Sequence, residues 1–143
     1  MSLSLRNRVR ELRLVKANEL LPNPKNWRTH PTAQVDALKG LLAEVGIAGA
    51  VLVRELPDGR LMLIDGHARA DLSGDNEIPV QVLDVSEEEA DKILATFDSV
   101  GKLAETNEDM LKELLEGVEF DSPAVNEMLE GMLGDTNDSS ESE

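Results

Sequence analysis

Ile64-Asp65-Gly66-His67-Ala68-Arg69 lies where the apolar run Leu61–Ile64 gives way to the start of a short helix. A strand that turns directly into a helix leaves the first backbone N–H groups of that helix unpaired, and such groups attract anions. Gly66 lets a ligand approach the backbone, and the Arg69 guanidinium forms two parallel hydrogen bonds to phosphate oxygens. We therefore predict a phosphate site formed by Gly66, His67, Ala68 and Arg69. The alternative is an ordinary helix start with an exposed arginine.

Asp65 and His67 flank this turn and are the candidate catalytic residues. An imidazole changes charge near neutral pH, which suits a general acid or base. Together with Asp71, one helical turn further on, they would hold one Mg²⁺ and position a water for phosphodiester hydrolysis. In the alternative interpretation, Asp65 caps the helix and neutral His67 only donates a hydrogen bond to phosphate.

The composition of the chain limits its class. Its 143 residues suffice for one main core, and because one Trp, two Phe and no Tyr are present, that core must be aliphatic. The absence of cysteine excludes disulfides, thiolate zinc sites and a cysteine nucleophile. No apolar run approaches the roughly 20 residues that span a bilayer, and the N-terminus lacks the apolar stretch of a signal peptide. We expect a cytoplasmic protein without membrane contact.

The net charge of −15 is unevenly distributed along the chain. Residues 1–83 carry 11 Lys or Arg and 10 Asp or Glu, whereas residues 84–143 carry 3 and 19. This asymmetry indicates a near-neutral functional domain followed by an acidic appendage. Because protein affinity for duplex DNA comes largely from basic residues that neutralise phosphates, we expect DNA binding to be weak or indirect.

Periodicity and turn residues predict an α+β fold, with a small mixed sheet flanked by helices and acidic helices at the C-terminal end. Pro57-Asp58-Gly59-Arg60 is typical of a hairpin turn, and Ser86 before three glutamates is typical of a helix start. The expected strands are 12–15, 50–54, 61–64 and 78–83, and the expected helices are 32–45, 67–72, 86–97, 107–117 and 122–133.

These elements define four predicted regions. Residues 1–11 form a flexible basic lead-in, and residues 12–104 form the phosphate-binding domain. Residues 105–133 form an acidic helical extension, and residues 134–143 form an acidic tail that is disordered by composition. The extension packs its apolar faces on the core or, alternatively, on a protein partner or a second copy of the chain.

Over about residues 12–100, the order of elements resembles the N-terminal domain of ParB-type partition proteins, in the ParB/sulfiredoxin superfamily. Pro22–Arg28 stands in the place of the family loop N-P-x-Q-P-R, and Gly46–Ala50 follows the first helix as in the family. Gly66-His67-Ala68-Arg69 matches the family's phosphate motif, which reads G-E-R-R or G-H-x-R. In this chain the motif is followed by Ile78-Pro79-Val80-Gln81-Val82-Leu83-Asp84, the pattern I-P-V-x-V-L-D. With this pattern the chain is similar to the ParB-like accessory domains that phages and mobile elements carry near DNA methyltransferase domains.

The resemblance implies nucleotide binding, with the triphosphate of CTP or ATP at Gly66–Arg69 and Mg²⁺ as an accompanying ion. It places the base and ribose near Gly46, Ala48 and Gly49. Arg28 would contact phosphate from the opposite side, with Asn26 beside it. The alternative for Arg28 is an arginine that only lies on the surface, and the alternative for Asn26 is an ordinary turn residue. For Trp27 we favour a core plug or a lid over a helix rather than a base-stacking platform.

The chain also departs from the family. Ala95–Gly101 lacks the Asn, Gln and Arg of the E-N-x-Q-R stretch found in CTP-dependent clamps, and no basic helix-turn-helix follows it. The essential cysteine of sulfiredoxin and the early glutamate of the free serine kinases are missing as well. These departures argue against clamp assembly, sulfiredoxin chemistry and kinase chemistry.

The sequence therefore predicts a nucleotide-binding, or phosphate-binding, module in DNA-related transactions such as partition, DNA modification or mobile-element biology. The alternative is a metal-dependent nuclease or nucleoside triphosphate hydrolase that uses Asp65, His67 and Arg69. The residues alone leave open whether the chain is an enzyme.

Overall fold

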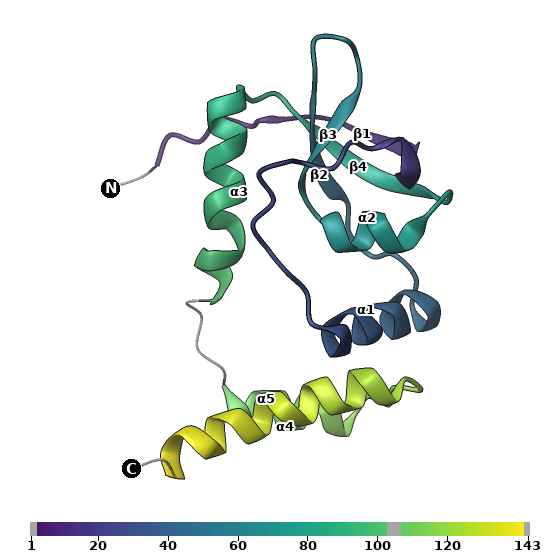
Figure 1. Ribbon diagram of the computed structural model, residues 1–143. Coiled ribbons are helices and arrows are strands. Elements are labelled where there is room, and N and C mark those ends of the chain that lie inside the picture. Colours follow the sequence, from purple (N-terminus) through teal and green to yellow (C-terminus); the bar gives the residue numbers. More distant parts are fainter. Residues whose placement is uncertain (1–2, 103–106, 142–143) are drawn as a thin grey trace. The chain divides into compact units, whose positions relative to one another are not determined.

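The computed structural model describes residues 3–102 and 107–141, with side chains for residues 3–97 and 107–133. It divides the chain into two compact units, each built from two segments (Figure 1). The sheet unit comprises Met1–Arg28 and Ile47–Leu103, and the helical unit comprises Thr29–Gly46 and Ala104–Glu143. The predicted boundary between residues 104 and 105 lies outside the described residues.

The sheet unit contains four strands in the order β1-β4-β2-β3. They are β1 (Val9–Lys16), β2 (Val51–Glu55), β3 (Leu61–Asp65) and β4 (Glu77–Leu83). β2 and β4 are parallel, whereas the pairs β1–β4 and β2–β3 are antiparallel. The sheet is therefore mixed, which confirms the predicted α+β class.

The hairpin between β2 and β3 follows from its turn residues. Gly59 has a φ of 91°, in the left-handed region that glycine adopts at little cost. The Asp58 carboxylate accepts a hydrogen bond from the Arg60 backbone N–H at 3.0 Å, as is usual for Asp at a turn. The predicted hairpin is thus confirmed. Its pairing places Asp65, at the end of β3, opposite Leu52, near the start of β2.

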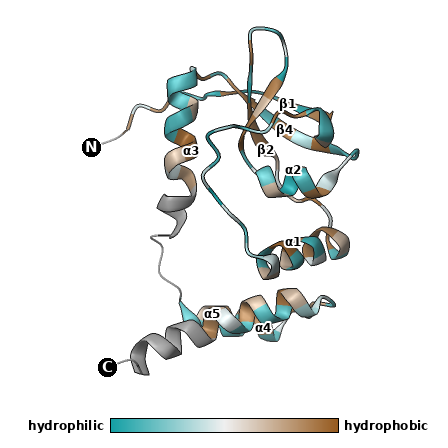
Figure 2. Cartoon of the chain, in the orientation of Figure 1, coloured by the Kyte–Doolittle hydropathy of each residue, from teal (hydrophilic) through white to brown (hydrophobic). Residues whose placement is uncertain are grey.

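The core is aliphatic and lies on both faces of the sheet. On one face, the 3-10 helix η1 (Ala17–Glu19) and the helix α2 (His67–Ser73) cover a cluster that includes the fully buried Val51 and Val80. On the other face, the helix α3 (Glu87–Lys102) packs Ala90 and Leu94 against β3 and β4. Figure 2 shows hydrophobic residues along the strands between these helices.

β1 begins at Val9, three residues before the predicted strand, because its backbone pairs with β4 whatever its side chains are. Just before β1, Arg8 forms hydrogen bonds with Asp84, which directly follows β4, and with Glu89 of α3. Its Nε donates to the Asp84 carbonyl at 2.8 Å, and its two terminal nitrogens donate to Glu89 at 2.7 and 2.9 Å. The lead-in of residues 1–11, which the sequence predicts to be flexible, therefore ends in residues held by hydrogen bonds to α3 and by strand pairing with β4.

α3 begins with a capping box, as the pattern Ser86–Glu89 allows. The Glu89 backbone N–H donates to Ser86 Oγ at 3.1 Å, and the Ser86 N–H donates to Glu89 Oε1 at 2.9 Å. The hydrogen bond from Arg8, followed by that from the Ser86 backbone, lowers the pKa of Glu89 to about 2. Glu89 thus joins the start of α3 to the start of β1.

We expect the contribution of Glu89 to stability to be lost in acid. Its folded pKa of about 2 lies below its ordinary value of 4.5, so the unfolded chain binds the proton first as the pH falls. The contribution is therefore complete above about pH 5 and disappears between that pH and about 2. Urea denaturation of wild type and Glu89→Gln should give midpoints that differ at pH 7 and converge below pH 3. A difference that does not change with pH would contradict this role.

The helical unit consists of α1 (Thr32–Glu44), α4 (Glu108–Glu116) and α5 (Pro123–Glu141). α1 and α5 pack together, with Ala37 and Val125 buried. A side chain at Gly40 would overlap Ser122 Oγ, so this glycine allows the close approach. α1 starts after Pro31, as predicted, and the Gly46 N–H donates to the Leu41 carbonyl at 3.3 Å just beyond the helix end.

Two features of this unit differ from the expectation. α1 was predicted to belong to the phosphate-binding domain, but it groups with the C-terminal helices because it packs on α5. α5 continues to Glu141 through residues 134–141, which were predicted to be disordered. Gly134 does not stop the helix, since a glycine inside a helix costs only about 1 kcal/mol relative to alanine. None of the helices in the described part of the chain is long and apolar enough to cross a membrane.

Candidate phosphate site

The turn between β3 and α2 has the backbone geometry that its sequence predicts. Ile64 is buried under α3, and Gly66 has a φ of 96°, which only glycine adopts readily. The chain then enters α2, where the Ala70 N–H donates to the Gly66 carbonyl at 3.0 Å. Gly66 is the N-cap residue and α2 has no side-chain cap. The alternative in which Asp65 caps the helix is therefore wrong.

Asp65 instead lies between two arginines from different parts of the sheet unit. Its Oδ1 accepts a hydrogen bond from Arg28 Nη2 at 3.0 Å, and its Oδ2 lies 3.9 Å from Arg69 Nη2. The side chains of Arg28, Asp65 and Arg69 are 13, 22 and 27% exposed, so all three are mostly shielded from water. Two positive charges and one negative charge leave the turn with a net charge of +1.

The loop that carries Arg28 is attached to both β3 and α2. Asn23 Nδ2 donates to the Leu63 carbonyl at 3.0 Å, and the Asn23 backbone N–H donates to His67 Nε2 at 3.4 Å. Asn23 was not among the predicted site residues. The signal available in the sequence was the pair Asn23-Pro24, because Asn before Pro favours a turn in which the Asn side chain bonds nearby backbone.

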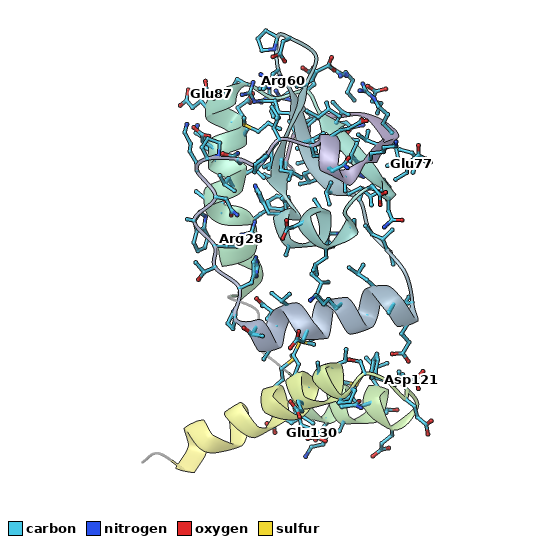
Figure 3. The ribbon with its side chains drawn as sticks, turned by 45° about the vertical axis from the view of Figure 1, so that its right-hand side comes forward. Arg28, Arg60, Glu77, Glu87, Asp121 and Glu130 are labelled. Atoms are coloured by element: carbon cyan, nitrogen blue, oxygen red, sulfur yellow. The ribbon has the colours of Figure 1, made fainter. Side chains whose placement is uncertain are left out.

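The same loop runs beside α3 before it reaches Arg28, which Figure 3 labels. Trp27 is half exposed and its Nε1 donates to the Leu94 carbonyl at 3.0 Å, so it lies over α3 as a lid rather than in the core. Asn26 Oδ1 accepts from the Arg28 N–H at 3.4 Å, which makes Asn26 a turn residue in this structure. These two residues directly precede Arg28, whose side chain donates to Asp65.

The loop before β2 contributes one of the predicted residues directly. The Gly49 carbonyl accepts a hydrogen bond from Arg69 Nη1 at 3.1 Å, and a Cβ at Gly49 would lie 3.1 Å from the same atom. Ala48 precedes it and is exposed. Gly46 belongs to the helical unit, so its part in the site stays a prediction. The turn thus brings together Gly49, Asp65, Gly66, Arg69 and Arg28, with Ala68 in the first turn of α2.

His67 belongs to a separate hollow beside the turn. A pocket of about 380 Å³ is lined by His67, Asn26 and Asp71 together with apolar residues of η1, β3 and α2, and Asp65 is not among its lining residues. Within residues 3–97 and 107–133, no three His, Asp or Glu side chains come close enough to hold a metal ion. The predicted Mg²⁺ site of Asp65, His67 and Asp71 is therefore wrong, because the first of these groups faces two arginines and the others face the pocket.

No known protein-family model and no curated protein matches the chain. Among solved structures, it is similar to the C-terminally truncated chromosome-partitioning protein ParB from Caulobacter crescentus, complexed with CTP-gamma-S. The TM-score is 0.60 at 23% identity, over 74% of this chain and 60% of that one. It is also similar to a Pnob8-like ParB-N domain, with a TM-score of 0.51 at 19% identity, over 71% of this chain and 41% of that one. The chain therefore has the fold of ParB N-terminal domains and spans less than two thirds of either neighbour.

Proposed function

We propose that the chain is a nucleotide-binding module that acts in DNA-related transactions such as partition, DNA modification or mobile-element biology. One observation carries the proposal, namely the convergence of Arg28 and Arg69 on opposite oxygens of Asp65 beside Gly66. Arginine is the side chain best suited to phosphate, because its planar donors match two oxygens at once.

Asp65 acts in this proposal as the residue that positions the two arginines. The Arg69 guanidinium has five N–H donors, and its hydrogen bond to the Gly49 carbonyl uses one of them. Other Arg69 donors can therefore reach a phosphate, while the Asp65 carboxylate holds the Arg28 and Arg69 side chains at the turn. The net charge of +1 at the turn attracts a polyanion.

The similarity in fold supports the nucleotide as the ligand. The ParB from Caulobacter crescentus was solved with CTP-gamma-S, and this chain has the corresponding fold together with arginines at its glycine turn. The proposal extends to CTP or ATP with Mg²⁺, the ion being bound through the phosphates as is usual for this metal.

Titration calorimetry with CTP, ATP, GTP and ADP in the presence of Mg²⁺ tests the proposal. We expect at least one triphosphate to bind with a dissociation constant below 1 mM, and more tightly than its diphosphate if the arginines contact the terminal phosphate. Repeating the titration with EDTA shows whether Mg²⁺ takes part. An absence of heat for every nucleotide at millimolar concentration would contradict nucleotide binding.

A further inference from the structure

α4 carries more apolar surface than its own unit buries. Leu111 and Leu115, four residues apart, are partly buried, whereas Met110 and Leu114 are 60 and 62% exposed. Since residues four apart lie on one face of a helix, Met110 and Leu114 form a second stripe beside the first. Val118, another four residues along, follows this stripe just beyond the helix end and is also exposed.

Acidic side chains border the exposed stripe. On a helix of 3.6 residues per turn, Asp109, Glu113 and Glu116 lie together on the side of Met110 and Leu114 that is opposite to the partly buried pair, and all three are exposed. Residues 108–130 contain eight Asp or Glu and a single Lys. Two of these acidic residues, Asp121 and Glu130, are labelled in Figure 3. The apolar stripe therefore lies beside a row of three carboxylates on α4.

α4, the helix that carries the stripe, has hydrogen bonds from this chain's own residues at both of its ends. Asn107 Oδ1 accepts from the Met110 N–H at 3.1 Å and caps the first turn, and Glu108 and Asp109 follow it. At the other end, the Gly117 N–H donates to the Leu114 carbonyl at 3.2 Å. A ligand of this surface would meet an ordered helix, so binding carries little cost for ordering it.

We propose that the exposed face of α4, namely Met110 and Leu114 with Asp109, Glu113 and Glu116, is a docking surface for a basic amphipathic helix of a partner protein. The apolar side of such a helix covers Met110 and Leu114, and its Lys or Arg residues then lie beside the three carboxylates. A second copy of this chain is disfavoured as the occupant, because it would bring the same negative face. Methionine adapts its shape to different partners, which suits a docking surface.

The test uses the full chain and a fluorescein-labelled peptide of about 18 residues, with Leu at spacings of three and four and Lys elsewhere. A second peptide of the same composition has its Leu residues scattered around the helix. Fluorescence anisotropy should show at least about tenfold tighter binding of the amphipathic peptide. Met110→Gln/Leu114→Gln should remove that advantage. The control, Leu12→Gln/Leu14→Gln, changes two equally exposed leucines of β1 in the sheet unit and should leave it unchanged.

A second variant, Glu113→Gln/Glu116→Gln, separates charge from apolar contact. It should weaken binding of both peptides and reduce the dependence of binding on salt, because two carboxylates are lost. Equal affinity for the two peptides, or an undiminished advantage in Met110→Gln/Leu114→Gln, would overturn the proposal. Sedimentation could also overturn it, by showing that the chain alone is a dimer and that Met110→Gln/Leu114→Gln dissociates this dimer. A second copy of the chain would then occupy the face.

Discussion

Arg69→Ala should weaken nucleotide binding by about a hundredfold or more. Hydrogen bonds to charged groups contribute about 1.5–3 kcal/mol each, and loss of one guanidinium removes up to two such bonds to phosphate, with 1.4 kcal/mol for each factor of ten. The variant also releases the Gly49 carbonyl and one side of Asp65, so the remaining Arg28 has less help in attracting the anion. Calorimetric titration with the triphosphate that wild type binds best measures the change.

The matched control for this variant is Arg60→Ala. Arg60 belongs to the same unit, but its side chain is 61% exposed on the hairpin turn, where it pairs with Asp58. Both variants remove one positive charge, so a difference between them isolates contact at the glycine turn from the effect of net charge. If the two substitutions weaken binding equally, or if Arg69→Ala has no effect, the phosphates bind elsewhere on the chain.

Gly66→Ala should destabilise the sheet unit by about 2–5 kcal/mol. A left-handed conformation costs a non-glycine residue about 1–2 kcal/mol, and overpacking of a dense core adds about 1–3 kcal/mol. The new Cβ would lie 2.5 Å from Val51 Cγ1 and 3.0 Å from Arg69 Nη2. Because Val51 is completely buried, it has no room to move away. The midpoint of chemical denaturation, followed by circular dichroism, measures the loss.

Gly59→Ala provides the comparison that separates backbone strain from overlap. Gly59 has a similar φ of 91°, but a Cβ there would meet no atom within 4 Å. We expect a loss of about 1–2 kcal/mol, from strain alone. Equal losses at the two glycines would mean that β2 and Arg69 adjust to the added methyl group, and the tight packing inferred at the phosphate turn would then be incorrect.

Much of the sheet unit is predictable from local sequence. The hairpin at Gly59, the turn at Gly66 and the capping box at Ser86 each depend on residues within about four positions of one another. Backbone conformation and short-range hydrogen bonds decide such features, so a pattern of residue types is enough to predict them. The extent of an element is harder to predict, as β1 and α5 show, because pairing or helix continuation can outweigh the composition.

The candidate site is only partly predictable in this way. Gly66, Arg69 and Gly49 were predicted, and all three meet at the turn. The sequence does not resolve the roles of Asp65 and His67, because the direction of each side chain depends on its contacts with the loop Pro22–Arg28. That loop supplies Arg28 to Asp65 and Asn23 to His67, and these contacts join residues that are far apart in the chain.

By itself, therefore, the sequence determined that a glycine turn with an arginine ends the third strand, since strand, glycine and helix signals are adjacent there. Only the tertiary structure decided that Asp65 holds two arginines rather than capping a helix or binding metal. It also decided that α1 packs on α5, where Gly40 admits Ser122. The physical reason is the same in both cases. Ion pairing and packing depend on which distant segments come into contact, and no local pattern of residues specifies that.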